Sequence, residues 1–175
     1  MATKRSQRLA FEIDKLTRSI ENVVTGDSFQ TVVLPFTKED LKTASRSNGW
    51  LFNWKQESAM RGRLVFKLTI VENPAIIQGL VSLEVKADHI AMQLVESAPF
   101  NLGRNKIYAG VLGNLVAFCC KRSFELGFAG NLAFIAKTRL IGHYEDTLKA
   151  VHVGSGRMVI ETAAAQYLVD KYFPA

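Results

Sequence analysis

The segment from residue 89 to residue 126 constrains the fold of this chain more than any other part of the sequence. A strand-like stretch, HIAMQLVESA (89–98), is followed by a turn and then by a helix-like stretch, GVLGNLVAFCCKRSFEL (110–126). The turn carries glycine where the helix would begin. A helix start leaves backbone N–H groups unpaired and carries the positive end of the helix dipole, so this pattern predicts a site for phosphate or another anion.

Positive charge is concentrated in the same region. Between Glu96 and Glu125 there is no acidic residue, whereas four cations lie there and account for most of the formal net charge of +6: Arg104, Lys106, Lys121 and Arg122. The alternative is that Gly110 and Gly113 serve packing, because glycine lets a helix approach a sheet closely. The residues alone leave both interpretations open.

The N-terminal segment LAFEIDKLTRSIENV (9–23) predicts an amphipathic helix. It places apolar residues at helical spacing and charged residues on the other face, the apolar ones being Leu9, Ile13, Leu16 and Ile20. The next stretch, FQTVVLPF (29–36), is typical of a strand. Thr37 is a good N-cap for a short helix that would end near residues 48–49.

Three strand candidates follow with short links between them: RLVFKLTIVE (63–72), AIIQGLVSLEVKA (75–87) and HIAMQLVESA (89–98). Short links favour antiparallel neighbours. After the helix, the remaining expected elements are a strand at 131–138, a helix at 139–148, a strand at 157–161 and a helix at 162–173.

This order of elements predicts one domain, residues 1–175, of the α/β (α+β) class. We expect a mixed, mostly antiparallel central sheet flanked by helices. One parallel strand–helix–strand crossover would lie at 89–136.

Composition excludes several classes of protein. Of the 175 residues, 48% are hydrophobic and 22% are charged, which is typical of a globular domain. Charged residues interrupt the apolar runs before the roughly 18–20 residues that a membrane span needs. The first residues, MATKRSQRLAFEIDK, contain acids and lack a continuous apolar core. We therefore expect a cytoplasmic protein with no membrane partner.

Cysteine and histidine are scarce and poorly placed for metal binding. The cysteines are Cys119 and Cys120, adjacent in an expected helix, and the histidines are His89, His143 and His152, without metal-ligand spacing. We expect a buried structural thiol at Cys119 and no metal.

Three stretches of the chain carry a resemblance to a known family: IAMQLVESAPF (90–100), YAGVLGNL (108–115) and LIGHYEDTLKA (140–150). In this order they resemble the fourth strand, the pyrophosphate loop and the Tyr-Glu stretch of the GNAT superfamily of N-acetyltransferases. The resemblance covers roughly residues 63–160. The loop departs from the family pattern, because Ile107 stands where Gln or Arg is usual and Leu112 stands where a small residue is usual.

The resemblance implies transfer of an acetyl group from acetyl-coenzyme A, as cosubstrate, to an amine by direct attack. The fourth strand would hold the pantetheine arm, and the loop amides would cradle the pyrophosphate with Lys106 as the cation. The implied cofactor-binding residues are Val95, Glu96, Lys106, Tyr108, Gly110, Val111, Leu112, Gly113 and Asn114.

Direct attack also needs an acid for the departing thiolate and a base for the ammonium. The resemblance implies Tyr144 as the acid; the alternative is a packed helix tyrosine. Glu96 is the candidate base, and its alternative is an exposed charge at a strand end. His143 has suitable chemistry, but a neighbour of Tyr144 on a helix is expected to point elsewhere. Three aromatic residues would line an acceptor pocket or belong to the core: Trp50, Phe52 and Trp54.

The acceptor stays open among a small-molecule amine, a peptide amine and an aminoacyl-tRNA, and so does assembly as a homodimer. Two other functions compete with the enzyme. One is a noncatalytic acyl-coenzyme A-binding module. The other is a nucleic-acid-binding protein that uses cations of the expected first helix, namely Lys4, Arg5, Arg8, Lys15 and Arg18.

Overall fold

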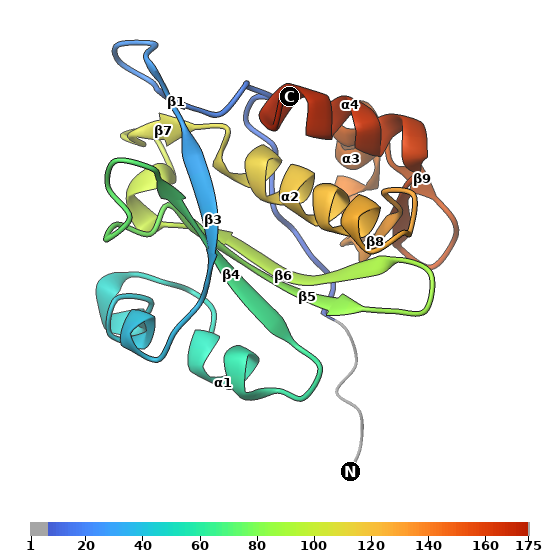
Figure 1. Ribbon diagram of the computed structural model, residues 1–175, viewed down its shortest axis with the longest axis horizontal. Helices are drawn as coiled ribbons and strands as arrows, with labels where there is room; N and C mark the ends of the chain where they lie inside the picture. The colour runs from blue at the N-terminus through green and yellow to red at the C-terminus, as the bar shows by residue number, and fades with distance from the viewer. Residues whose placement is uncertain (1–6, 175) are drawn as a thin grey trace.

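A seven-stranded sheet runs through the molecule in the order β3-β4-β5-β6-β8-β10-β9 (Figure 1). The structure is a computed structural model and describes residues 7–174. The strands are β3 (Thr31–Pro35), β4 (Leu64–Ile70), β5 (Gly79–Val85), β6 (Ile90–Ser97), β8 (Leu132–Ile135), β9 (Val151–His152) and β10 (Arg157–Ile160). Neighbours are antiparallel except β6 and β8, which are parallel. The predicted mixed sheet with one parallel crossover is confirmed.

Helices cover the two faces of this sheet unequally (Figure 1). On one face lie α2 (Val111–Glu125), α3 (Ile141–Leu148) and α4 (Thr162–Tyr172). The other face carries the short helix α1 (Trp54–Ala59). Four 3-10 turns complete the helical elements of residues 7–174: Glu39–Lys42, Arg46–Asn48, Pro99–Asn101 and Thr138–Leu140.

Helix α2 packs closely on the sheet and forms the centre of the core. A Cβ atom at Gly79 would lie 2.8 Å from Val111 and 3.0 Å from Leu115, so only glycine lets the helix approach this strand. Cys119 and Cys120 are both buried, as expected for Cys119. Burial raises the pKa of the Cys119 thiol to about 12.

The parallel strands form a fork. Strands β6 and β8 pair only at Ile90–Leu132 and Ala91–Ala133. Directly after these pairs, β6 bulges, because Met92 and Leu94 face consecutive residues of β5 and leave Gln93 as an extra residue. Beyond the bulge the two strands separate, and the space between them is the position of the candidate site.

The predicted N-terminal helix at 9–23 is wrong. Residues 9–17 run extended, and Leu9, Phe11 and Ile13 are buried while the residues between them are more exposed. This alternation is the period of a strand, and the buried side chains gain more from the core than a helix would give them. Thus the basic helix face proposed for nucleic acid does not form. Its residues Lys4 and Arg5 lie outside the described part of the chain.

A small second sheet replaces the end of that expected helix. Strand β1 (Ile20–Asn22) pairs with β2 (Ser28–Phe29) and with β7 (Tyr108–Ala109), both antiparallel. The sheet ties the N-terminal segment to the loop before α2.

Two further expectations need correction. The helix expected after Thr37 is divided into two 3-10 turns, and the aromatic alternation at 50–54 ends in helix α1, with Trp50 and Trp54 in the core. Asn53 caps α1 by accepting a hydrogen bond from the backbone N–H of Gln56 at 2.9 Å. Within residues 7–174 every helix is too short or too polar to cross a bilayer.

Candidate active site

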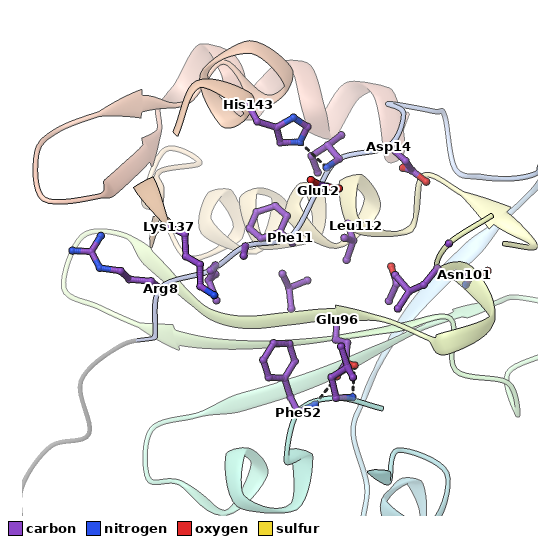
Figure 2. A pocket seen from close by; sticks show the side chains of 18 of the residues that line it. Arg8, Phe11, Glu12, Asp14, Phe52, Glu96, Asn101, Leu112, Lys137 and His143 are labelled. Carbon is purple, nitrogen blue, oxygen red and sulfur yellow. Dashed lines mark hydrogen bonds between the residues drawn. The ribbon is translucent and has the colours of Figure 1, made fainter. Parts of the chain in front are cut away.

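A cavity of about 1080 Å³ lies at the fork and is lined from both faces of the sheet (Figure 2). Leu51 and Phe52 line it on the α1 side, whereas Leu112 of α2 and His143 of α3 line it on the other side. Residues 95–97 of β6 form one wall. The cavity is therefore bordered by residues from both faces of the sheet.

The opposite wall is formed by residues 8–14, which we call the strap. The strap runs between β6 and the helices (Figure 2) and extends the edge of β8. The backbone N–H of Leu9 donates to the carbonyl of Ile135 at 2.6 Å, and Lys137 N–H donates to the carbonyl of Leu9 at 2.9 Å. The strap thus lies on the β8 side of the fork, where Leu9 forms one parallel bridge with Ala136.

The structure brings together some of the predicted cofactor-binding residues. Val95, Glu96, Lys106 and Leu112 line the cavity. The others stand apart from its lining. The backbone N–H of Tyr108 donates to Asn101 Oδ1 at 3.0 Å. The remaining residues of the loop are buried against the protein itself, namely Val111, Gly113 and Asn114.

Lys106 and Gly110 do bind an anion, but that anion belongs to the chain. Asp14 Oδ2 lies 2.9 Å from Lys106 Nζ, and Asp14 Oδ1 accepts a hydrogen bond from Gly110 N–H at 3.2 Å. Gly110 has φ of 88°, a left-handed conformation that favours glycine and turns its N–H toward the carboxylate. The Gly110 N–H is therefore bonded to a carboxylate of the chain itself, and the binding of a pyrophosphate at the start of α2 stays a prediction.

Gly113 serves packing. A Cβ atom there would collide with the Tyr172 hydroxyl and lie 3.2 Å from Leu16. The Tyr172 hydroxyl accepts a hydrogen bond from Thr17 N–H at 3.0 Å, next to the strap. Gly113 therefore serves packing against Tyr172 of α4 and the N-terminal segment and not against the sheet. Gly110 is also closely packed, against Thr17 and Ser19, besides its contact with the Asp14 carboxylate.

Tyr144 lies beside the cavity and is fully buried. Its hydroxyl donates a hydrogen bond to the backbone carbonyl of Phe11 in the strap at 2.5 Å. Its ring packs against Phe11 and Phe134, with centroids 4.6 and 5.1 Å away. Burial raises the pKa of Tyr144, so the hydroxyl keeps its proton at neutral pH.

Both carboxylate oxygens of Glu96 accept hydrogen bonds from the protein. The carboxylate is neither exposed nor free, because it accepts hydrogen bonds from Leu51 N–H at 2.7 Å, Phe52 N–H at 3.3 Å and Trp54 Nε1–H at 2.8 Å. These bonds fix residues 51–54 against the end of β6 (Figure 2). Phe52 reaches the cavity as a result, whereas Trp50 and Trp54 belong to the core.

The expectation that His143 points elsewhere is wrong. His143 points into the cavity, where its Nε2 atom accepts a hydrogen bond from Ile13 N–H at 2.9 Å (Figure 2). Further polar lining residues are Arg8, Glu12, Ser97, Asn101, Lys137 and Arg139. The alternation of Leu9, Phe11 and Ile13 was the available signal for the strap. Residues 7–174 contain no group of three or more His, Cys, Asp or Glu side chains placed to hold a metal ion.

No protein-family model matches the sequence, and no curated protein matches it. Solved structures do match. Mutant forms of the spermidine/spermine N-acetyltransferase SpeG from Vibrio cholerae superpose with a TM-score of 0.55 at 15% identity, over 79% of this chain and 97% of that chain. A chain of the KacTA–DNA complex gives a TM-score of 0.50 at 11% identity, over 79% of this chain and 98% of that chain. The fold is therefore that of the GNAT acetyltransferases, as the sequence resemblance implied.

Proposed function

From the GNAT fold and the cavity at its fork, we propose that this protein transfers an acetyl group from acetyl-coenzyme A to an amine. The observation that carries the proposal is the cavity of about 1080 Å³ between the divergent strands β6 and β8, lined from both faces of the sheet. Direct transfer requires the thioester and the amine to meet from different sides, and this cavity provides one space with two walls of different chemistry.

In this proposal the pantetheine arm lies along residues 95–97 of β6, and the phosphates approach Lys106 and Gly110. The neutral amine nitrogen attacks the thioester carbonyl carbon and the C–S bond breaks. The thiolate takes a proton from the Tyr144 hydroxyl, and the proton that the acylated nitrogen releases restores that hydroxyl. The buried, protonated state of Tyr144 suits that role. The three hydrogen bonds to Glu96 favour a positioning role for that residue, which holds Leu51 and Phe52 at the amine side.

The charge of the cavity suggests the class of amine. Its cations are Arg8, Lys106, Lys137 and Arg139. Its three carboxylates are Glu12, Asp14 and Glu96, so the cations exceed the carboxylates by one. Asp14 is paired with Lys106, and Glu96 keeps its charge while it accepts bonds from neutral N–H groups. A polycation such as the spermidine named for SpeG would meet repulsion here. We propose an acceptor that carries a carboxylate or phosphate besides its amine.

The test begins with calorimetric titration of the full chain with acetyl-coenzyme A. The comparison ligand is adenosine 3′,5′-diphosphate, which lacks the pantetheine arm. We expect acetyl-coenzyme A to bind more tightly, because only its arm fills the cavity. Thiol release is then measured against neutral, cationic and anionic amines.

A charge-reversal pair controls for general electrostatics. Lys137→Glu changes a cavity residue, and Lys55→Glu makes the same change on α1, outside the cavity lining. We expect a loss of acetyl-coenzyme A affinity on the order of tenfold for the first variant only. Binding without release of thiol by any amine would favour the noncatalytic module, which the strap in the fork also supports. Absence of binding would refute both.

A further inference from the structure

We infer that the strap is an internal competitor of the cofactor, so that acetyl-coenzyme A must displace residues 8–14 to bind. This inference rests on the proposed function and concerns the regulation of the same site. The inference follows from the contacts of the strap. Several of the groups that bind the strap are the groups that the proposed function assigns to the phosphates and the thiolate of acetyl-coenzyme A.

The first such group is the anion site. The Asp14 carboxylate takes both the Lys106 ammonium and the Gly110 N–H, at 2.9 and 3.2 Å. A diphosphate presents the same kind of charged oxygen to the same two donors. The carboxylate and the diphosphate cannot occupy this position together.

The second such group is the pair of side chains on α3. Tyr144 donates to the Phe11 carbonyl at 2.5 Å, and His143 Nε2 accepts from Ile13 N–H at 2.9 Å. While these bonds exist, the Tyr144 hydroxyl is directed at the strap backbone and is not available to a thiolate. Release of residues 11–13 would free the Tyr144 hydroxyl and the His143 Nε2 atom to contact a bound ligand.

The apolar contacts of the strap fill the same fork. Leu9, Phe11 and Ile13 are buried, and the Phe11 ring lies 5.4 Å from that of Phe134 between centroids. The pantetheine arm is a chain of similar width with alternating amide and methylene groups, so it can replace an extended peptide at low cost.

The ion pair of the strap is a weak contact, because the side chains of Asp14 and Lys106 are each 29% exposed and solvent screens their attraction. The buried side chains of the strap and its backbone bonds to the end of β8 must be replaced by contacts of the ligand. Beyond the strap, Thr17 is buried and is fixed by Tyr172. The segment can therefore swing away from β8 while residue 17 stays in place.

Hydrogen–deuterium exchange of the full chain, with and without saturating acetyl-coenzyme A, tests the inference. The direction of the change in exchange rate at residues 8–14 decides it. If the strap is displaced, the Leu9 and Ile13 amides lose their acceptors and the 8–14 region exchanges faster when ligand binds. The region around the start of α2 should exchange more slowly in the same sample. Slower or unchanged exchange of residues 8–14 upon binding would overturn the inference and leave the proposed function intact.

Two matched variants sharpen the test. Asp14→Asn removes the carboxylate charge from the anion site, whereas Asp27→Asn makes the same change at an exposed residue outside the cavity lining that has no ion pair among residues 7–174. We expect Asp14→Asn to bind acetyl-coenzyme A on the order of fivefold more tightly and to speed exchange of the free strap, with Asp27→Asn unchanged. Equal affinities in the two variants contradict competition. If the wild-type protein and both variants all fail to bind, the proposed function fails together with the inference.

Discussion

The Tyr144 hydroxyl and the Phe11 carbonyl, 133 positions apart in the chain, are joined by a buried hydrogen bond of 2.5 Å. The bond links helix α3 to the strap and directs the proton of Tyr144 into the fork. Its geometry has two consequences: the tyrosine stabilises the closed strap, and it holds a donor ready for whatever replaces the strap.

Tyr144→Phe should separate these two roles. We expect acetyl-coenzyme A affinity to be retained or increased, because the strap loses a bond. Turnover should fall by about 10²-fold or more, because the thiolate loses its acid. Isothermal titration and thiol-release rates measure the two quantities.

Tyr172→Phe is the control for that variant. Tyr172 is also buried and also holds the N-terminal segment, but its hydroxyl bonds to Thr17, which does not line the cavity, whereas the Tyr144 hydroxyl bonds to the lining residue Phe11. The loss of the Tyr172 hydroxyl should leave turnover near that of the wild-type protein. Equal turnover in Tyr144→Phe and the wild type would remove the acid assignment.

Glu96→Gln tests whether Glu96 positions a loop or accepts a proton. Glutamine keeps the size but turns an NH₂ group toward three N–H donors, so we expect a loss of roughly 1–3 kcal/mol in unfolding free energy. If Glu96 only positions residues 51–54, KM for the amine rises while the pH profile of kcat/KM keeps its shape.

A base at Glu96 would instead remove the acidic limb of that profile. Glu57→Gln is a matched control, since Glu57 is buried, is paired with Arg63 at 3.3 Å and lies outside the cavity lining. It should lower stability without changing KM.

The sheet could be predicted because its signals are local. Residues 63–98 alternate and are divided by short polar links, and the glycine turn before α2 marks the crossover. Lys106 and Gly110 contact the carboxylate of Asp14, and their predicted role in binding the pyrophosphate stays a prediction. Asp14 could not be found in this way, because it lies 92 positions from Lys106 and no local pattern joins them.

The prediction of a helix in the N-terminal segment was wrong for a different reason. Leu9 and Ile13 satisfy a helical period and a strand period equally well, and Phe11 between them decides for the strand. That choice depends on the open edge of β8, which only the tertiary structure supplies. Likewise, Glu96 has no sequence signal for burial, since its three donors come from residues 51–54.

The buried thiols of Cys119 and Cys120 should react slowly with thiol reagents. Desolvation raises the pKa of both Cys119 and Cys120, and Cys119 reaches about 12, so almost no thiolate exists at neutral pH. We expect slow labelling by Ellman's reagent in buffer and two thiols per chain in denaturant. Rapid labelling of the folded protein would show that α2 is less well packed than described. Slow labelling also keeps the protein's own thiols out of the thiol-release measurement.

Asp40 should make stability depend on pH in the acid range. Lys67 Nζ lies 2.9 Å from both carboxylate oxygens, and Thr37 N–H donates at 2.7 Å. Burial acts to raise the pKa of Asp40, but the bonds from Lys67 and Thr37 outweigh it, so the pKa lies below its ordinary value of 3.8. Stability from this group is therefore complete above pH 3.8 and is lost as the pH falls through the lower folded-state pKa.

Asp40→Asn should consequently cost roughly 1–2 kcal/mol of unfolding free energy at pH 7, and the difference should shrink as the pH falls toward the folded-state pKa of Asp40. Urea denaturation at several pH values measures it. Glu125→Gln is the comparison, because Glu125 pairs with Lys121 on the surface of α2 with 41% of its side chain exposed. An exposed pair of this kind contributes less than about 0.5 kcal/mol. Two results would contradict this prediction: equal losses of unfolding free energy in the two variants, or a loss for Asp40→Asn that does not change with pH. Either would show that solvent screens the Asp40–Lys67 pair, although the pair lies between β4 and the first 3-10 turn.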